Sequence, residues 1–432
     1  MSELVKVIGG GLAGCECALQ LLKAGFHVKM YEMRPKKNTG AHSTDKLAEL
    51  VCSNSLKSEE PTTASGLLKE ELNLLGCELL SLASKSKVPS GSALAVDRNK
   101  FSELVENALQ AYDGFELVRE EVTELDDTPT VIATGPLTSD AMAKIVGEIS
   151  GKKRLFFYDA IAPIVAADSI DYDKAYFGGR YGKGGEDYLN LPMQRDEYEA
   201  FYRALVEAQT VVLHDFEKSE LFDGCRPIEE MAKRGSDTIR FGPLKPVGLR
   251  NPKTGEKAYA VVQLRRENVA GDCFNLVGFQ TNLTYGEQKR VFSMIPALRN
   301  AEFLRYGVMH RNTYINAPNV LTEFFRVKAS ATPLYIAGQL SGVEGYVESI
   351  MSGMIAGQAI GAELRGLESY MPSEFTVIGS LCRYISACPT DFKPMNANLG
   401  ILPPITDVRD KKARKQAYHD RSIATIPMLL DC

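Results

Sequence analysis

Two cysteines stand where a thiol could act chemically, and the first is Cys225. It lies in the segment DGCRPIEEM, in which Pro227 suits the first turn of a helix and two glutamates suit its positive end. A thiol at a helix N-terminus beside Arg226 is expected to have a lowered pKa and to form the nucleophilic thiolate. The same residues suit a cysteine that merely packs under the helix start. On the local sequence, both interpretations stand.

The second cysteine, Cys52, is harder to interpret. The letters SNS that follow it offer hydroxyls and an amide, but no charge that would lower a thiol pKa, so a structural cysteine is favoured locally. The functional alternative depends on its place in the long polar segment 34–65, because long loops in compact proteins usually have a function. His310, in MHRNTYIN, suits either an aromatic ligand or a loop, and taken alone the loop is favoured.

The elements that would position such groups begin with a nucleotide-binding βαβ unit. An apolar strand at 4–8 runs into Gly9, Gly11 and Gly14, a helix follows, and a second strand ends at Glu32. In such a unit the glycines allow a tight turn, a close approach of backbone to a pyrophosphate, and packing of the helix on the strand. Glu32 suits a ribose hydroxyl, and the helix N-terminus suits an anion. The unit predicts a dinucleotide site.

A later strand-glycine-helix element favours FAD over a nicotinamide as the tightly bound ligand. The run TPLYIAGQ at 332–339 is typical of a strand that ends in glycine, and a helix is expected at about 344–364. A flavin domain needs such an element to point a second helix N-terminus at the pyrophosphate or the isoalloxazine ring.

Between these two parts, the texture of the sequence changes to aromatic and glycine-rich segments, which predicts an insertion. The sequence therefore predicts an α/β fold: a FAD-binding Rossmann-like domain of the glutathione-reductase type with an inserted α+β domain. We expect the FAD-binding domain to comprise residues 1–150 and 315–432, and the inserted domain to comprise 151–314.

Composition narrows the class of protein. The chain has 432 residues, 44% hydrophobic content and a net charge of −5, which is ordinary for a soluble protein of two or three domains. The start of the chain lacks the uninterrupted apolar region of a signal peptide and no apolar run is long enough for a bilayer, so a cytoplasmic protein without membrane contact is expected. Nine scattered cysteines argue against a disulfide framework, and their spacing together with the dispersed histidines gives no indication of a metal.

Basic residues gather at 409–421, 152–154 and 265–266. For any single cluster, a solvated face is the favoured interpretation, but several clusters on a protein that handles a polyanion would mean more. The tail beyond residue 405 is expected to be the most mobile part of the chain.

Many longer motifs together resemble one family, the bacterial folate- and FAD-dependent tRNA (uracil-5-)-methyltransferases, which are relatives of the larger glucose-inhibited division protein A family. The resemblance covers Gly9 to about Pro404. Three motifs in order, without a long C-terminal helical extension, favour the methyltransferases: CSNSLKS, GCRPIEEM and HRNTYIN. The other motifs are GGGLAGCECA, YEMRP, AHSTDKLAELV, VDRNKF, VIATGPLTS, YDAIAPIV, RFGPLKPVGL, GFQTNLTYGEQKRVF and GQLSGVEGYVESIMSG.

The resemblance implies that the protein methylates carbon 5 of the T-loop uridine at position 54 of tRNA, which gives ribothymidine. The one-carbon unit would come from 5,10-methylenetetrahydrofolate through reduced FAD, with NAD(P)H (NADH or NADPH) as the reductant. The resemblance also implies that Cys225 adds to carbon 6 of uracil and that Cys52 removes the proton from carbon 5. His310 would face the folate pterin, with Tyr346 near it. The inserted domain would contact the RNA or the substrate.

FAD would be held, again by resemblance, by the glycine-rich turn, the ribose carboxylate and the late turn. These residues are Gly9, Gly10, Gly11, Leu12, Ala13, Gly14, Glu32, Arg34, Gly338, Gly342 and Val343. One departure is Leu191 in YLNLPM, where the family often has a cysteine, so this position cannot be catalytic here.

Two other activities are alternatives to this methylation. A division-protein-A-type enzyme would install an aminomethyl group on a wobble uridine, but the missing extension and the GCRPIEEM cysteine speak against it. A plain flavin oxidoreductase would need a paired-cysteine motif or a second nicotinamide fingerprint, and the sequence has neither. A non-catalytic FAD-binding module is the remaining alternative.

Overall fold

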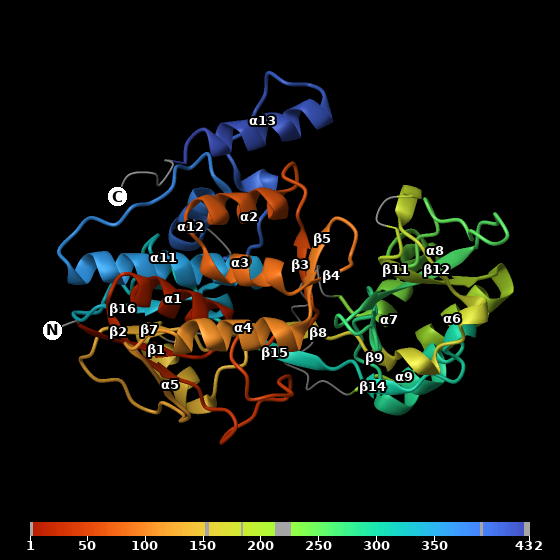
Figure 1. Ribbon diagram of the computed structural model, residues 1–432, viewed down its shortest axis with the longest axis horizontal. Coiled ribbons are helices and arrows are strands. Elements are labelled where there is room, and N and C mark those ends of the chain that lie inside the picture. The colour runs from red at the N-terminus through yellow and green to blue at the C-terminus, as the bar shows by residue number, and fades with distance from the viewer. Residues whose placement is uncertain (1–2, 152–154, 183–184, 212–225, 389–391, 427–432) are drawn as a thin grey trace.

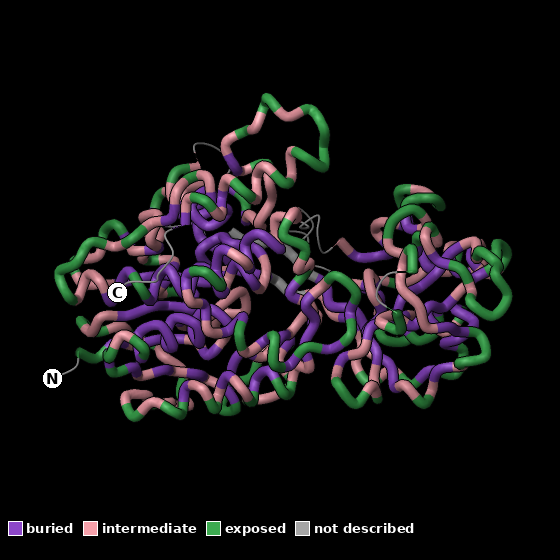
Figure 2. The backbone as a smooth tube through the Cα atoms, turned by 45° about the horizontal axis from the view of Figure 1, so that its top comes forward, coloured by how far each residue is buried: buried purple, intermediate pink, exposed green. Residues whose placement is uncertain are grey.

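The computed structural model has two units side by side (Figure 1), and it describes residues 3–151, 155–182, 185–211, 226–388 and 392–426. The first unit contains the first and the last described residues, 3 and 426. The chain leaves it through β8 (Leu155–Ala160) and returns through β15 (Met309–Tyr314), and these two strands pair antiparallel with each other. Figure 2 shows that each unit has its own buried interior.

A five-stranded parallel sheet forms the centre of the first unit, with the strand order β16-β7-β1-β2-β6. β7 and β16 are buried at every position because both faces of the sheet are covered there, whereas β1, β2 and β6 carry Lys6, Lys29 and Glu116 at partly or fully exposed positions. Figure 1 places α1 (Leu12–Lys23) and α11 (Tyr346–Leu364) on one face and α5 (Asp140–Ile149) on the other. The strands are β1 (Leu4–Ile8), β2 (His27–Tyr31), β6 (Phe115–Val118), β7 (Thr130–Ile132) and β16 (Leu334–Ile336).

The carboxyl ends of three adjacent strands lie at one edge of this sheet. β1 is followed by Gly9, β7 by the segment 133–135, and β16 by Gly338. In open α/β sheets, ligands bind outside the carboxyl ends of the strands. The topology therefore brings the early and late glycine turns together, although more than 300 residues separate them along the chain.

The segment 34–65, which the sequence analysis treats as one long loop, contains the strand β3 (Ser55–Ser58). β3 pairs with β5 (Ala93–Val96), which in turn pairs with β4 (Lys87–Val88). The expectation of a continuous loop is wrong here because SLKS lacks a clear apolar alternation, and a partner some 40 residues away makes it a strand. The helices α2 (Ala64–Leu74), α3 (Glu78–Lys85) and α4 (Arg98–Gln110) complete this region.

A six-stranded antiparallel sheet forms the second unit, in the order β10-β11-β12-β13-β9-β14. Phe201, Phe279 and Phe292 pack in its core, and Leu191 is fully buried on β11. The strands are β9 (Ile164–Ala166), β10 (Tyr176–Phe177), β11 (Tyr188–Met193), β12 (Ala260–Arg266), β13 (Cys273–Leu276) and β14 (Phe303–Arg305). The helices are α6 (Arg195–Glu207), α7 (Ile228–Ala232), α8 (Ser236–Phe241) and α9 (Tyr285–Phe292).

The C-terminal part folds back on the first unit through α10 (Ala317–Val320), α12 (Val377–Ala387) and α13 (Lys411–Ile423). Glu71 of α2 is buried and accepts hydrogen bonds from the first backbone amides of α12 and from the hydroxyl of Ser422 in α13. Burial raises the pKa of Glu71 to about 7. The tail expected to be mobile thus contains a helix with a buried anchor.

Within the described ranges, no helix has the length and apolar character needed to cross a membrane.

Candidate functional site

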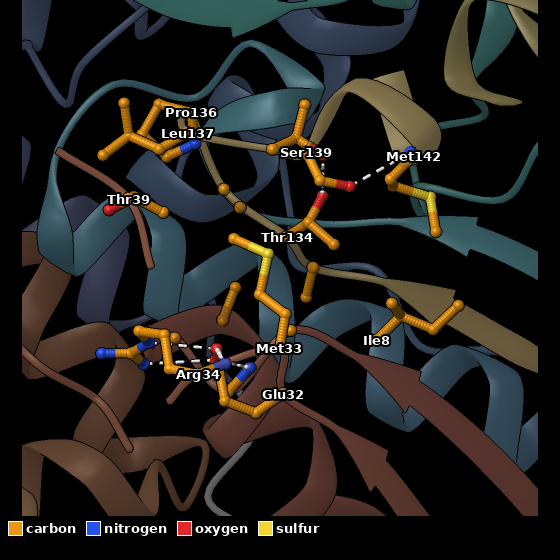
Figure 3. A pocket seen from close by; sticks show the side chains of 18 of the residues that line it. Ile8, Glu32, Met33, Arg34, Thr39, Thr134, Pro136, Leu137, Ser139 and Met142 are labelled. Atoms are coloured by element: carbon orange, nitrogen blue, oxygen red, sulfur yellow. Dashed lines mark hydrogen bonds and ion pairs between the residues drawn. The ribbon is translucent and has the colours of Figure 1, made fainter. Parts of the chain in front are cut away.

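A first cavity opens at the carboxyl ends of β1, β7 and β16, with about 1030 Å³ of empty space including the part open to solvent. Figure 3 looks into it: Glu32 and Arg34 lie together on one side, and Pro136, Leu137 and Ser139 line the opposite side. The predicted cofactor residues in its wall are Gly9, Gly10, Gly11, Leu12, Ala13, Glu32, Arg34 and Gly338.

Glycine occurs at the three positions of the first turn for different structural reasons. Gly9 has a φ of 109° and a Cβ there would lie 2.4 Å from the carbonyl oxygen of Ala133. A Cβ on Gly14 would lie 1.9 Å from the carbonyl oxygen of Gly9. Gly11, the N-cap of α1, faces open space within the cavity, and a Cβ there would meet nothing within 4 Å. The fold itself therefore requires glycine at 9 and 14, whereas at 11 the space matters only to something that enters the cavity.

Glu32 and Arg34 form a buried charge network at one end of the cavity. The Gly10 amide donates to Glu32 Oε2 at 3.0 Å, and Arg34 Nε donates to Glu32 Oε1 at 3.0 Å. Arg34 also donates to Glu49 Oε2 at 2.9 Å. Burial opposes the ionisation of Glu32, but the Arg34 guanidinium and the backbone amides outweigh it and hold the pKa of this carboxyl below its usual value.

His42 completes this end of the cavity. Burial and the nearby Arg34 charge lower its pKa to about 4, so its imidazole is neutral at pH 7.

Three of the predicted cofactor residues lie outside the cavity wall. Gly14 packs inside α1, and Val343 is fully buried. Gly342 has a left-handed backbone with a φ of 91°, and a Cβ there would lie 2.4 Å from the ring of Phe392. These residues shape the turns behind the wall.

A second cavity, with about 1200 Å³ of empty space including open solvent, adjoins the first. Five residues line both cavities: Val51, Pro136, Leu137, Gln339 and Tyr346. The strand β15 adds Asn312, and the second unit adds Ile161 and Gln280, so this cavity lies at the junction between the units. The amide side chains in its wall were missed by the sequence analysis, because an isolated glutamine or asparagine carries no local signal.

Cys52 lines the second cavity and is half-buried. Its backbone amide donates to the hydroxyl of Tyr346 at 2.7 Å, and its Sγ lies 3.7 Å from the carbonyl oxygen of Ala160. Burial, and then the proximity of Cys52, raise the pKa of the Tyr346 phenol above its usual range, so the hydroxyl stays protonated. By contrast, Cys15 and Cys17 are fully buried in α1, and burial raises the pKa of both thiols.

Both units hold the segment that carries Cys52. Asn54 is fully buried, and its Nδ2 donates to the carbonyl oxygens of Val96 in the first unit, at 3.1 Å, and Arg266 in the second, at 2.9 Å. Its Oδ1 accepts a hydrogen bond from Arg265 Nε at 2.8 Å. Arg265 is therefore buried in the junction and does not belong to a basic surface.

A second link runs through Arg98 of α4, which donates to the carbonyl oxygen of Leu50 and pairs with Glu267 Oε2 of the second unit at 2.7 Å. Asn54 belongs to the CSNSLKS motif, but nothing in the sequence points to its partners across the junction. Residues 50–54 are therefore fixed with respect to both units.

Two predicted site residues lie wholly or partly outside the described part of the chain. Cys225 lies outside the described residues, as does the side chain of His310, whose backbone belongs to β15. The described chain just after Cys225 shows Pro227 as the N-cap of α7, one position before the helical turn expected for it. The amide of Ile228 donates to the carbonyl oxygen of Gln280 at 2.7 Å, so the start of α7 is attached to a residue of the second cavity.

Among the described residues, no group of three or more histidine, cysteine, aspartate or glutamate side chains is arranged to hold a metal ion.

Comparison with known proteins places this geometry in a family. The model of the family described as glucose inhibited division protein A matches residues 4–368. The chain belongs to this family. Proteins named methylenetetrahydrofolate–tRNA-(uracil-5-)-methyltransferase TrmFO, from Moorella thermoacetica and Bacillus subtilis, are 52% and 50% identical to it over 426 residues. These alignments cover 98% of this chain and 97% and 98% of the two relatives.

GidA of Aquifex aeolicus, in its form I crystal, has the same fold. The TM-score is 0.70 at 15% identity, over 98% of this chain and 75% of the GidA chain. The predicted α/β fold class and the resemblance drawn from the motifs are thus confirmed.

Replacing Asn54 tests the junction. Asn54→Ala leaves the buried Arg265 Nε and two carbonyl oxygens without their partner, and each unsatisfied group costs about 1–3 kcal/mol. We expect the free energy of unfolding in urea to fall by about 2 kcal/mol or more, and alkylation of Cys52 by iodoacetamide, followed by mass spectrometry, to become faster. The exposed Asn107 on α4 supplies the control, Asn107→Ala, which should change neither quantity. Equal stability and equal alkylation rates for the two variants would contradict the described junction.

Proposed function

We propose that this protein is a FAD- and folate-dependent methyltransferase that converts the T-loop uridine at position 54 of tRNA to ribothymidine, in the cytoplasm and with NAD(P)H as reductant. The observation that carries the proposal is the shared wall of the two cavities: the cavity lined by the glycine-rich turn after β1 adjoins a second cavity that is lined by a half-buried thiol. The relatives at 50–52% identity are named for the same folate, for tRNA and for methylation at carbon 5 of uracil.

The first cavity fits FAD. The open space above Gly11 accepts a pyrophosphate against the N-terminus of α1, and Glu32 is held ionised beside it for a ribose hydroxyl. Gly338 and Gln339, after β16, also line this cavity, and Gln339 lines the second cavity as well. When bound, FAD supplies the carrier of the one-carbon unit between folate and RNA.

The second cavity would take the folate pterin and the uracil in turn. Its wall combines apolar surface from Val51, Leu137 and Ile161 with the amide groups of Gln280 and Asn312. Both planar ligands need that combination, because their faces are apolar and their edges offer hydrogen-bond donors and acceptors. Tyr346 and His310 are the residues we assign to the pterin.

The two thiols would perform the chemistry on uracil. Carbon 5 of uracil is a poor nucleophile until a group adds at carbon 6, so the Cys225 thiolate would form an Sγ–C6 bond and move the electron pair toward O4 as an enolate. Carbon 5 of this enolate then attacks the one-carbon unit. The Cys52 thiolate would then remove the proton from carbon 5, and the bond between the one-carbon unit and its carrier would break, which leaves an exocyclic methylene on carbon 5. A hydride that derives from NAD(P)H would reduce this methylene to the methyl group, while the Sγ–C6 bond breaks and the carbon 5–carbon 6 double bond is restored.

The direct test is transfer of label. The purified yellow protein is incubated with labelled 5,10-methylenetetrahydrofolate, NADPH and an unmodified tRNA transcript, and nucleosides are separated after digestion. We expect label in ribothymidine at position 54 only. Label that is absent there, or present in a wobble uridine, would refute the proposed function.

The same system assigns the thiols. A T-loop hairpin with 5-fluorouridine at the target position should be trapped covalently by the parent protein and by Cys52→Ala, because fluorine blocks the removal of the carbon 5 substituent after the thiol has added. Cys225→Ala should trap no RNA on a denaturing gel. Trapping by Cys225→Ala, or its loss in Cys52→Ala, would reverse the two assignments.

Gly11 separates folding from cofactor binding. A Cβ at residue 11 meets no protein atom within 4 Å, so Gly11→Ala should leave the thermal unfolding of the FAD-free protein unchanged within about 0.5 kcal/mol. The added Cβ of Gly11→Ala would occupy the space assigned to the pyrophosphate. We therefore expect the flavin content of the purified variant to be at least tenfold lower than that of the parent protein. Gly286→Ala, at an exposed position of α9 where a Cβ also meets nothing, is the matched control and should retain full flavin. A Gly11→Ala protein that remains fully yellow would contradict the assignment of the first cavity.

A further inference from the structure

The helix α13 begins with a dense group of positive charges that the proposed chemistry does not use. Arg409, Lys411, Lys412, Arg414 and Lys415, here called the basic tract, fall within seven positions and have one acid, Asp410, among them. Three of the five side chains are exposed and two are partly exposed. None of the five forms an ion pair with any residue in the described part of the chain. This positive charge is a local feature, because the whole protein has a net charge of −5.

Helix stability does not explain this arrangement. The N-terminus of a helix carries a partial positive charge, so acidic side chains stabilise the first turn and lysines destabilise it. α13 has no acid in its first turn, while Lys411 and Lys412 occupy its first two positions. Asp410 is the N-cap, and its Oδ1 accepts a hydrogen bond from the Ala413 amide at 2.7 Å. The side chains and the helix terminus therefore add to a single positive field, and local rules broken in this way are expected at functional positions.

The anchors of α13 all lie in its second half. Ser422 Oγ donates to the buried Glu71 at 2.6 Å, and His419 Nε2 lies 3.0 Å from Glu70 Oε2. The Arg421 guanidinium donates to the Pro403 carbonyl at 2.6 Å and lies 4.7 Å from the ring centre of Phe375. The last turns thus hold the helix on α2, and the first turns carry the basic tract outward. Figure 1 shows α13 as the outermost helix, beyond α2.

The chain that leads to α13 starts at the second cavity. Asn396 lines that cavity, and its neighbour Ala397 donates its amide to Glu348 at the start of α11. Lys57 on β3 also lines this cavity and pairs with Glu348 at 3.1 Å. β3 packs against α2, the helix on which α13 is anchored. The second cavity and the basic tract are therefore connected by the chain from Asn396 to Arg409 and by the packing of both β3 and α13 on α2.

We propose that the basic tract binds the phosphate backbone of the substrate RNA at nucleotides outside the one that enters the second cavity. This inference rests on the proposed function. Charge complementarity selects RNA as the occupant, because the tract presents rows of flexible cations and has no apolar surface for a protein helix. Of the other basic clusters, 265–266 offers only the partly exposed Arg266, because Arg265 is buried in the junction, and 152–154 lie outside the described residues.

Charge reversal at two positions tests the proposal without unfolding the helix. In the variant Lys411→Glu with Lys412→Glu, the new acids stand at the positive end of α13, where they favour the helix. With full-length tRNA transcript, we expect KM for the RNA to rise about tenfold with kcat unchanged. We also expect the plot of the logarithm of the RNA association constant against the logarithm of the salt concentration to become less steep, by between one and two in the magnitude of its slope. NADPH-dependent reduction of the flavin without RNA should stay at the parent rate. The control is Lys36→Glu with Lys144→Glu, two exposed lysines elsewhere on the first unit, which should keep the parent KM.

The outcomes separate the inference from the proposed function. If the parent protein methylates tRNA and the α13 variant has the parent KM and salt slope, the inference is wrong. An equal rise of KM in the control variant would show an effect of net charge alone, which also overturns it, as would binding of the tract to anionic phosphatidylglycerol vesicles with RNA binding unaffected. Failure of the parent protein to label any tRNA would instead refute the proposed function.

Discussion

The side chain of Asn54 supplies the constraint on which the rest of the site depends. It is fully buried and bonds to the backbone of both units, and Arg265 completes its hydrogen bonds. Nearby, the Arg98–Glu267 pair makes a second crossing of the same junction and holds the Leu50 carbonyl. Because desolvation offsets most of the attraction within a buried ion pair, such a pair is weak evidence for stability. Its evident effect here is geometric: two units with separate cores keep one short segment, and the Cys52 thiol on it, at a fixed place.

That place is where the two cavities meet. The carboxyl ends of the parallel strands form the first cavity from backbone turns, which can approach a phosphate closely, whereas the second cavity is formed by side chains from both units and the connecting strands. Tyr346 belongs to both walls and accepts the Cys52 amide, so the start of α11 and the thiol segment are positioned together. A carrier in the first cavity and an acceptor base in the second cavity would then be in contact at this shared wall.

Much of the first unit could be predicted because its signals are local. The strand expected at 4–8 and the helix expected at about 344–364 follow from local apolar patterns, and the roles of Gly9 and Gly14 follow from a turn formed by adjacent residues. The failures involve partners distant in sequence. β3 becomes a strand only through pairing with β5. The anchor of α13 is likewise invisible locally, because Glu71 and Ser422 are more than 300 residues apart.

We expect the flavin ring to lie at the wall common to both cavities, with the Cys52 thiol facing the second cavity, where the folate would bind. A crystal structure of the protein with FAD and 5,10-methylenetetrahydrofolate bound measures this directly. The account predicts the isoalloxazine ring against Val51, Gln339 and Tyr346, the pterin stacked on it within the second cavity, and Asn54 still bonded to both units. An isoalloxazine ring placed away from these residues, or a folate bound elsewhere on the protein, would contradict it.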